Sequence, residues 1–505
     1  MNFPLLSYLI FTPWFGALLL AILRHHLPGH LGRILPVAFS LSTVVFGLVA
    51  LGYFEPAATG MQFSEDVTWI KALNVHYHLG LDGLSLVLVL LTGIVAPLAL
   101  HGATRSTRCP AIHGALFLLL QGSALGVFLA LDFFPWFVFW ELSLVPAFFL
   151  IKLWGGPGAA RAAYQFVIYT IGGSAFLLLG FAALYAASGT FDFLQLAALA
   201  RSGELAAKLG GGFWPQAAFL GVLLGLAVKV PLFPFHAWLP PTYAEAPTGT
   251  SMFLTGVMSK MGAYGFLRLL WPLFPGPLHA AAPVLLWLAL GGVVLSAFAA
   301  MKQTDLKRMV AYSSINHLSY CLLALFAVAA LGPVNPAARA AALSGTILQL
   351  FNHGLSAAAL FFCVGILESR SGGRRGLGDF GGVRAAAPVF AGFCGVALFS
   401  SLGLPGLNGF VGEFLILRGV FGLVPWAAAV ATLGLLATAL FLLTFWQRVF
   451  HGPAAGAGVN FRDLDATEVV TLLPFIVLMF ALGILPQLLA GLINPLVNHW
   501  VTSMP

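Results

Sequence analysis

Apolar runs long enough to cross a lipid bilayer follow one another along the whole chain of 505 residues. A membrane-spanning helix needs about 20 mainly apolar residues, and fourteen segments reach that length. They lie at about 4–23, 33–53, 82–101, 113–131, 133–153, 164–187, 215–238, 249–271, 281–301, 308–330, 342–367, 388–421, 425–447 and 469–491. Charged residues make up only 8% of the chain, against about 25% in soluble globular proteins. The pattern excludes a soluble enzyme and predicts an all-α polytopic membrane protein with about 14 transmembrane helices.

Basic residues are distributed unequally between the two sets of loops. If the N-terminus lies outside, the inner loops hold fifteen Lys and Arg residues and the outer loops hold six. The six outer ones are Lys71, Arg201, Lys208, Arg268, Arg339 and Arg418. Because short cytoplasmic loops are enriched in Lys and Arg, the asymmetry predicts that both termini lie outside. No basic segment precedes the first apolar run, so we expect a retained span rather than a cleaved signal peptide.

Neither the basic residues nor the cysteines form a pattern that binds a cofactor or a nucleic acid. The 23 Lys and Arg residues are scattered and make no stripe for nucleic acid. The cysteines are far apart, which excludes the usual spacings of zinc and iron–sulfur sites and indicates no disulfide framework. They are Cys109, Cys321, Cys363 and Cys394. We therefore expect this chain to bind no metal and no redox cofactor. We also expect it to contact the lipid bilayer and to bind no nucleic acid.

Four charged residues fall in the middle of apolar spans. They are Glu141 in the fifth span, Lys229 in the seventh, Lys260 in the eighth and Glu413 in the twelfth. A charge at the centre of a membrane helix costs roughly 2.5–3.5 kcal/mol on insertion scales, so such residues usually face a partner or water. Two acids and two bases could form static buried ion pairs. Four such residues on four helices favour a path for ions or protons instead.

Three histidines extend this series. His317 and His353 lie near the middle of the tenth and eleventh spans, and His236 lies beside a broken stretch of the seventh. Free imidazole has a pKa near 6.5 and can therefore accept and release a proton at neutral pH. For each histidine alone, a hydrogen-bonded core position is the simpler reading, and haem ligation is a weaker alternative without a paired-histidine pattern. Taken with the four charges, the histidines predict a proton path.

Proline and glycine interrupt two of the spans. Pro231 is the first of four prolines within eleven residues of the seventh span, and Pro405 lies in a glycine-rich stretch before Glu413. Proline removes a helical hydrogen bond, and interrupted spans in corresponding places of two halves indicate a transport site. We therefore expect two inverted five-helix repeats. They would occupy residues 111–272 and 273–450, after a three-helix segment at 1–110 and before a C-terminal helix at 451–505.

Five stretches, in this order along the chain, resemble the antiporter-like membrane subunits of respiratory complex I. They are WELSLVP at 140–146, KVPLFPFHAWLPP at 229–241, TGTS at 248–251, DLKRMVAYSS at 305–314 and HGLS at 353–356. Related subunits occur in multisubunit cation/proton antiporters and membrane-bound hydrogenases. The resemblance implies a protein that moves protons, driven by quinone reduction elsewhere in a larger complex.

The resemblance also implies a type within the family and its surroundings. The ionisable residue of the broken twelfth span is typically lysine in the L and N types and glutamate in the M type. Glu413 therefore favours the M type, and so does a chain that ends soon after its fourteenth span, because the L type carries a further lateral helix. The implied partners are L-type and N-type subunits, with NADH, FMN, iron–sulfur clusters and quinone on other subunits. The implied location is a bacterial inner membrane, with both termini in the periplasm.

The resemblance assigns roles to the residues found above. Glu141 and Lys229 would form an ion pair near an inlet half-channel. Lys260, His317 and His353 would lie on a central hydrophilic axis, and Glu413 would lie nearest the outlet. His236, Pro231 and Pro405 would support these groups. The alternatives are an Mrp-type cation/proton antiporter subunit, the membrane subunit of an energy-converting hydrogenase, and a scaffold that conducts nothing.

Overall fold

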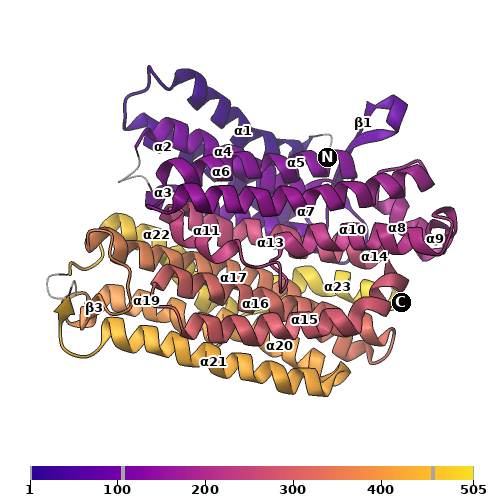
Figure 1. Ribbon diagram of the computed structural model, residues 1–505. Coiled ribbons are helices and arrows are strands. Elements are labelled where there is room, and N and C mark those ends of the chain that lie inside the picture. Colours follow the sequence, from indigo (N-terminus) through magenta and orange to yellow (C-terminus); the bar gives the residue numbers. More distant parts are fainter. Residues whose placement is uncertain (1–2, 104–107, 457–460, 504–505) are drawn as a thin grey trace.

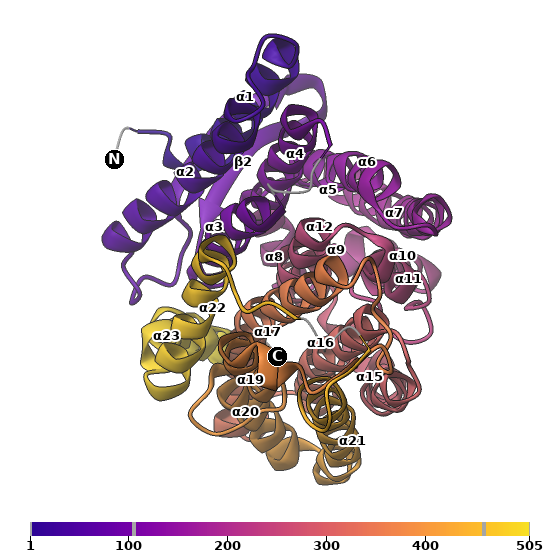
Figure 2. The ribbon, with the colours of Figure 1, turned by 90° about the vertical axis from the view of Figure 1, so that its left-hand side faces the viewer.

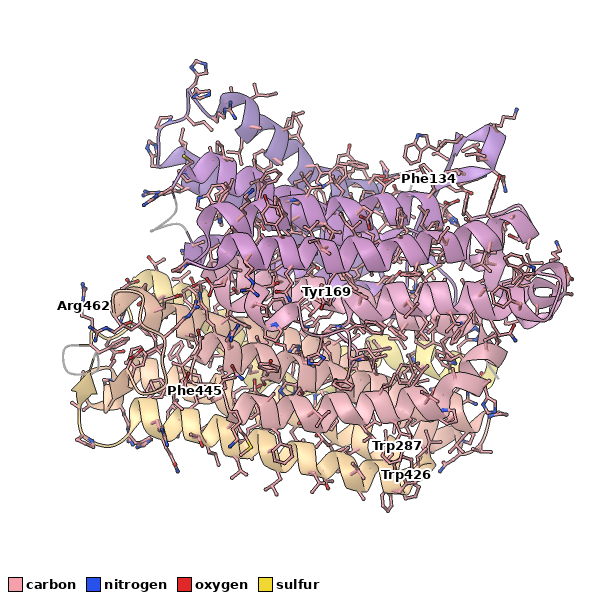
Figure 3. All side chains as sticks on the ribbon, in the orientation of Figure 1. Phe134, Tyr169, Trp287, Trp426, Phe445 and Arg462 are labelled. Carbon is pink, nitrogen blue, oxygen red and sulfur yellow. The ribbon has the colours of Figure 1, made fainter. Side chains whose placement is uncertain are left out.

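The computed structural model describes residues 3–103, 108–456 and 461–503 as a helical bundle (Figure 1). Most helices run along one common direction, so the loops gather at two opposite ends. The hairpin end carries the antiparallel strands β1 (Gln62–Ile70) and β2 (Val75–Leu81). The opposite end, where Arg462 lies (Figure 3), is called the basic end. Both ends of the described chain lie toward the hairpin end (Figure 1), as an even number of spans requires.

Eleven helices of the described residues are long and apolar enough to cross a membrane, which makes the chain an integral membrane protein. They are α1 (Leu5–Leu23), α2 (Leu31–Tyr53), α3 (Gly83–Ala103), α4 (Pro110–Leu129), α5 (Phe133–Leu142) continued by α6 (Leu144–Trp154), α7 (Ala159–Ser188), α15 (Pro275–Met301), α16 (Leu306–Leu331), α17 (Pro336–Arg370), α21 (Pro425–Phe450) and α22 (Ala466–Ile484). Each coincides with one of the predicted apolar runs, and the predicted fold class is confirmed.

Of the other three predicted spans, two are interrupted helices and one is a continuous helix with two π-helical turns. The seventh is α10 (Phe213–Lys229) followed by α11 (Leu239–Glu245), and the twelfth is α19 (Pro388–Ser401) followed by α20 (Asn408–Leu423). The eighth consists of α12 (Thr248–Phe253), η2 (Leu254–Met258), α13 (Ser259–Gly265), η3 (Phe266–Leu270) and α14 (Trp271–Leu273). Proline and glycine predicted the first two breaks. The eighth span has no break, and its two wider π-helical turns, η2 and η3, were not predicted from the sequence.

Helix α17 forms the centre of the bundle (Figure 2). The most apolar 18-residue window of this helix is completely buried, whereas α2 and α22 bury only about a third of theirs. Helices α3, α12, α16 and α20 all pack against α17. A helix that is enclosed on every side can hold polar side chains only if they find partners within the protein. Functional groups are therefore expected around α17.

Aromatic side chains lie on the outer surface near the hairpin end. Trp287 of α15 and Trp426 of α21 pack against each other with tilted rings, whose centroids lie 4.6 Å apart, and both are exposed (Figure 3). Tryptophan is enriched where membrane meets water, because its ring is apolar and its N–H is polar. We therefore expect one edge of the bilayer near this pair.

Several elements outside the spans differ from the prediction or add to it. The β1–β2 hairpin occupies a gap from which the sequence predicted no strand. The remaining short elements are η1 (Lys71–Leu73), α8 (Phe193–Arg201), α9 (Glu204–Lys208), β3 (Phe380–Gly381), α18 (Val383–Ala386) and β4 (Ala455–Gly456). The last span was predicted as one helix over 469–491, but α22 ends at Ile484 and α23 (Gln487–Ser503) follows. Pro486 explains this break, because a residue before proline avoids helical geometry.

Two of the arginines assigned to outer loops are instead buried in helices. Arg268 lies in η3, 9% exposed, and its Nη2 lies 2.5 Å from Asp82 Oδ2 at the start of α3. Arg339 is buried in α17. The long stem of arginine carries the charge away from its own backbone position. A position near the end of an apolar run therefore does not decide whether the charged group lies in a loop or between helices.

Candidate functional site

Lys260 lies on α13, between the two π-helical turns of the eighth span. Its side chain is fully buried, and Nζ donates to the carbonyl oxygen of Thr255 at 2.5 Å and contacts Ser259 Oγ at 3.3 Å. Turns of this kind are frequent at functional sites. Here they flank the segment that carries a buried amine.

Three more helices extend this contact into a row. Lys260 Nζ lies 2.8 Å from Nδ1 of His353 on α17. The ring centroid of His353 lies 5.3 Å from that of His317 on α16. His317 Nδ1 in turn lies 2.7 Å from Oε1 of Glu413 on α20. These four side chains, called the central row, come from four helices, and the structure brings them together in a continuous series of neighbours.

The break in the twelfth span positions Glu413 at the end of the central row. A Cβ atom at Gly403 would lie only 2.9 Å from Glu413 Oε2, so glycine lets the carboxylate approach the backbone here without shifting. Asn408, the first residue of α20, accepts a hydrogen bond from Ser400 Oγ at 2.5 Å and joins the two halves of the span. Gln349 Nε2 donates to Glu413 Oε1 at 3.1 Å. The carboxylate is thus held from α17 and lies beside the end of α19.

Glu141 and Lys229 lie apart from the central row, where α5 passes the end of α10. Lys229 Nζ lies 4.9 Å from the ring centre of Trp140, the neighbour of Glu141 in the chain. Both Lys229 Nζ and Glu141 Oε1 are buried without a hydrogen-bond partner in the part of the chain that the structure describes. The two charges interact through space, but they are separated rather than paired in direct contact. Glu141 also borders a cleft of about 610 Å³ between α5, α6 and α7.

The three supporting residues occupy the two breaks. Pro231 follows the end of α10, and Pro405 lies between α19 and α20. His236 lies in the stretch between α10 and α11, where its ring stacks on Phe233 with centroids 5.3 Å apart. Its Nδ1 is buried and has no hydrogen-bond partner among the described residues. His236 therefore belongs to the broken seventh span and not to the central row.

Some polar residues of the site were not singled out from the sequence. Thr255 Oγ1 and Ser314 Oγ lie 2.8 Å apart beside Lys260, and Gln349 contacts Glu413. Hydroxyl and amide residues are common everywhere, which is why they carried no weight alone. The spacing of two of them could have indicated a polar helix face beside Lys260, because Thr255 and Ser259 are four residues apart and lie on one side of the helix.

The structure places no metal-binding cluster in residues 3–103, 108–456 and 461–503, where no three His, Cys, Asp or Glu residues are arranged to hold an ion. The central row instead contains an amine, two imidazoles and a carboxylate. Such groups accept and release protons, and an adjoining series of them can pass a proton along.

The family described as NADH:quinone oxidoreductase/Mrp antiporter, TM, matches residues 130–440. The chain belongs to this family. All six predicted proton-path residues fall inside the matched segment, from Glu141 to Glu413. NADH-quinone oxidoreductase subunit M of Mycobacterium tuberculosis is 35% identical over 541 residues, which cover 100% of this chain and 95% of that protein.

Two solved structures show the same architecture as this family member. A chain of the respiratory complex I from Thermus thermophilus with bound NADH has a TM-score of 0.84 at 29% identity, covering 98% of this chain and 100% of that one. A chain of the Mrp complex from Dietzia sp. DQ12-45-1b has a TM-score of 0.85 at 21% identity, covering 99% and 98%. The second similarity shows the fold alone.

Proposed function

We propose that this chain is the M-type, proton-translocating membrane-arm subunit of an NADH:quinone oxidoreductase. The observation that carries the proposal is the central row, in which Lys260, His353, His317 and Glu413 lie in series inside the bundle. The full-length similarity to subunit M supports this member of the family.

Electrostatics gives the row a way to work. A proton on Lys260 places a positive charge 2.8 Å from His353, and like charges in a low-dielectric interior repel strongly. His353 therefore resists protonation while Lys260 is charged, and the negative charge of Glu413 lies 2.7 Å from the His317 ring at the other end of the row. Loss of the charge at one end of the row thus changes proton affinity at the next member.

Glu141 and Lys229 supply a second, separable pair of charges. While the two side chains are apart, neither charge is neutralised by the other, and Lys229 Nζ has no hydrogen-bond partner among the described residues. An unpaired charge of this kind is costly in a membrane interior. Closing the pair would neutralise both groups, and opening it would free Lys229 to release its proton toward Lys260. We infer that residues 111–272 and 273–450 are two inverted repeats. Opening and closing of the Glu141–Lys229 pair would couple proton movement in the first repeat to that in the second.

The surroundings of the subunit are part of the same proposal. L-type and N-type subunits would flank the chain in a bacterial inner membrane, with both of its termini on the periplasmic side. NADH, FMN, iron–sulfur clusters and quinone would be bound by partner subunits. An Mrp-type antiporter is less well supported, because the similarity to the Mrp chain is 21%. Transport that depends on sodium ions would favour that alternative.

The variant Lys229→Ala tests the proposal. In inverted membrane vesicles containing the whole complex, proton pumping driven by NADH should be lost, while electron transfer from NADH to an artificial acceptor persists. Lys208→Ala, which removes an exposed lysine in α9, should leave both activities unchanged. Normal pumping by Lys229→Ala, or an assembly that contains no redox subunits, would contradict the proposal.

A further inference from the structure

An apolar groove lies on the outer surface between α1 and α4, far from the proton path. Its volume is about 600 Å³, and it is lined by two stripes of side chains that run along the helices. Ala17, Ala21 and Ala115 are the small residues of its lining, and the large side chains of Phe15 and Leu18 beside them are 60% and 59% exposed. A groove of this shape, open to the bilayer and parallel to the helices, suits an acyl chain.

One wall of the groove is fixed by a polar contact. Trp14 Nε1 donates a hydrogen bond to the carbonyl oxygen of Leu119 on α4 at 3.1 Å. Its ring also packs against Phe11 with centroids 5.5 Å apart. The groove is therefore a preformed feature of the α1–α4 packing, which is among the more extensive helix–helix contacts of the bundle.

The groove ends at Arg24, which is exposed at the basic end and belongs to its lining. Other exposed basic or titratable side chains lie at the same end of the bundle, in the first turn of α2 and in the loops before α2 and α4. They are His25, His26, His30, Arg33 and Arg108. The sequence contains no Asp or Glu from residue 1 to 54, nor from 83 to 131. The positive charge at this corner is thus not neutralised by the elements that build it.

We propose that the groove binds an anionic phospholipid of the membrane, with an acyl chain between α1 and α4 and the phosphate headgroup at Arg24 and Arg33. Basic pockets on the cytoplasmic side of membrane proteins recognise such headgroups, and apolar walls alone do not discriminate between lipids. The charge at the end of this groove supplies the discrimination. This inference is independent of the proton path.

Photo-crosslinking in the intact complex tests the assignment. Leu18 would be replaced by the photoreactive residue benzoylphenylalanine, and the complex would be reconstituted in nanodiscs of phosphatidylcholine with a minor fraction of phosphatidylglycerol. After irradiation, mass spectrometry would identify and quantify the lipid adducts. Phosphatidylglycerol adducts should exceed the bulk ratio. Because each basic residue near a headgroup contributes about fivefold in binding, Arg24→Gln together with Arg33→Gln should reduce the enrichment by at least tenfold, toward the bulk ratio.

Two further variants separate the charge from the groove. Ala21→Phe fills the groove without changing charge and should also abolish the enrichment. Arg448→Gln removes an exposed arginine at the end of α21, away from the groove, and should leave the enrichment unchanged. The proposal would be overturned by a wild-type adduct ratio equal to the bulk, by enrichment that survives the double variant, or by adducts with a neighbouring subunit instead of lipid.

Discussion

Glu413 is the residue on which the end of the central row depends. It contacts His317 at 2.7 Å and Gln349 at 3.1 Å, and it is only 4% exposed. Charge-assisted contacts in a dry interior are stronger than neutral ones, and leaving one partner unpaired there is costly. The carboxylate therefore connects α20 with α16 and α17 at this end of the row.

Replacing Glu413 by Gln should uncouple the row at this point. The amide keeps the size of the side chain but carries no negative charge, so the row should lose the charge that attracts a proton to this end. Proton pumping in vesicles should fall at least tenfold, while Glu413→Asp retains part of it because the charge remains. Glu204→Gln, which neutralises an exposed acid in α9, is the matched control. Equal pumping by the Gln and wild-type proteins would exclude a role for the charge.

At the scale of elements, the interrupted helices explain how polar groups reach the middle of the bundle. The backbone at Gly403 and Gly406 adopts φ values of +80° and +92°, and α20 then begins at Asn408. A left-handed backbone costs roughly 1–2 kcal/mol for residues that carry a Cβ atom. Glycine at these two positions therefore allows the turn that places Glu413 in the central row.

Gly406→Ala should lower the stability of the folded chain by about 1–2 kcal/mol, because alanine disfavours this backbone. No atom lies within 4 Å of the added Cβ, so the effect is conformational and not steric. Gly392→Ala, in α19 of the same span, also meets no neighbour but has helical geometry, and it should be neutral or slightly stabilising. Denaturant unfolding in mixed micelles measures both. Equal effects of the two variants would contradict this account of the turn.

The β1–β2 hairpin is held to the bundle by groups that titrate outside the spans. His78 Nδ1 lies 2.7 Å from Asp192 Oδ2, and this hydrogen bond raises the pKa of His78, with further contributions from Asp66 and Asp132. Burial raises the pKa of Asp132 to about 6, although its carboxylate also accepts the backbone N–H of His76. Both groups therefore bind protons more tightly in the docked hairpin than in an undocked one.

Docking of the hairpin should weaken as the pH rises. A group whose pKa is raised by folding stabilises the fold below its unfolded pKa, and this contribution is lost as the pH passes the folded pKa. The contribution of Asp132 is lost as the pH rises from 3.8 to about 6. The contribution of His78 is lost at pH values above 6.5. Hydrogen exchange of the β2 amides, corrected for intrinsic rates, should show falling protection. The variant His78→Asn should remove the loss of protection above pH 6.5, and the control variant His26→Asn should not. Protection independent of pH would contradict the prediction.

At the scale of the whole molecule, hydropathy predicted the number and position of the spans, because a helix that crosses a bilayer needs about 20 mainly apolar residues. The buried charges were predicted for the same reason, and four of the six proton-path residues meet in the central row. Glu141 and Lys229 were expected in direct contact but lie apart, and the ion pair of Arg268 with Asp82 was not expected. Such outcomes depend on which side chains face each other, and hydropathy along the chain contains no such information.

The basic end shows how contacts far apart in sequence join the two halves of the chain. Arg375, which follows α17, lies 2.6 Å from Glu245 of α11 and 2.7 Å from Asp305, the residue before α16. Glu245 Oε2 also accepts the backbone N–H of Gly158 at 2.8 Å, just before α7. These acids raise the pKa of Arg375 against the effect of burial, so the guanidinium stays charged and links the two halves.

Removing this guanidinium should destabilise the assembled bundle more than removing a nearby charge. Breaking a buried ion pair costs about 3–5 kcal/mol, and because Glu245 and Asp305 are 17% and 24% exposed, Arg375→Gln should lose roughly 3 kcal/mol. Arg374→Gln, which changes the exposed neighbouring arginine, should stay within about 0.5 kcal/mol of wild type. Denaturant unfolding in mixed micelles measures the difference, and Arg375→Lys should recover part of it, since one charge contact can reform. If Arg375→Gln and Arg374→Gln have equal free energies of unfolding, Arg375 contributes no more to stability than an exposed arginine does. The contacts around Glu245 would then not hold the two halves together.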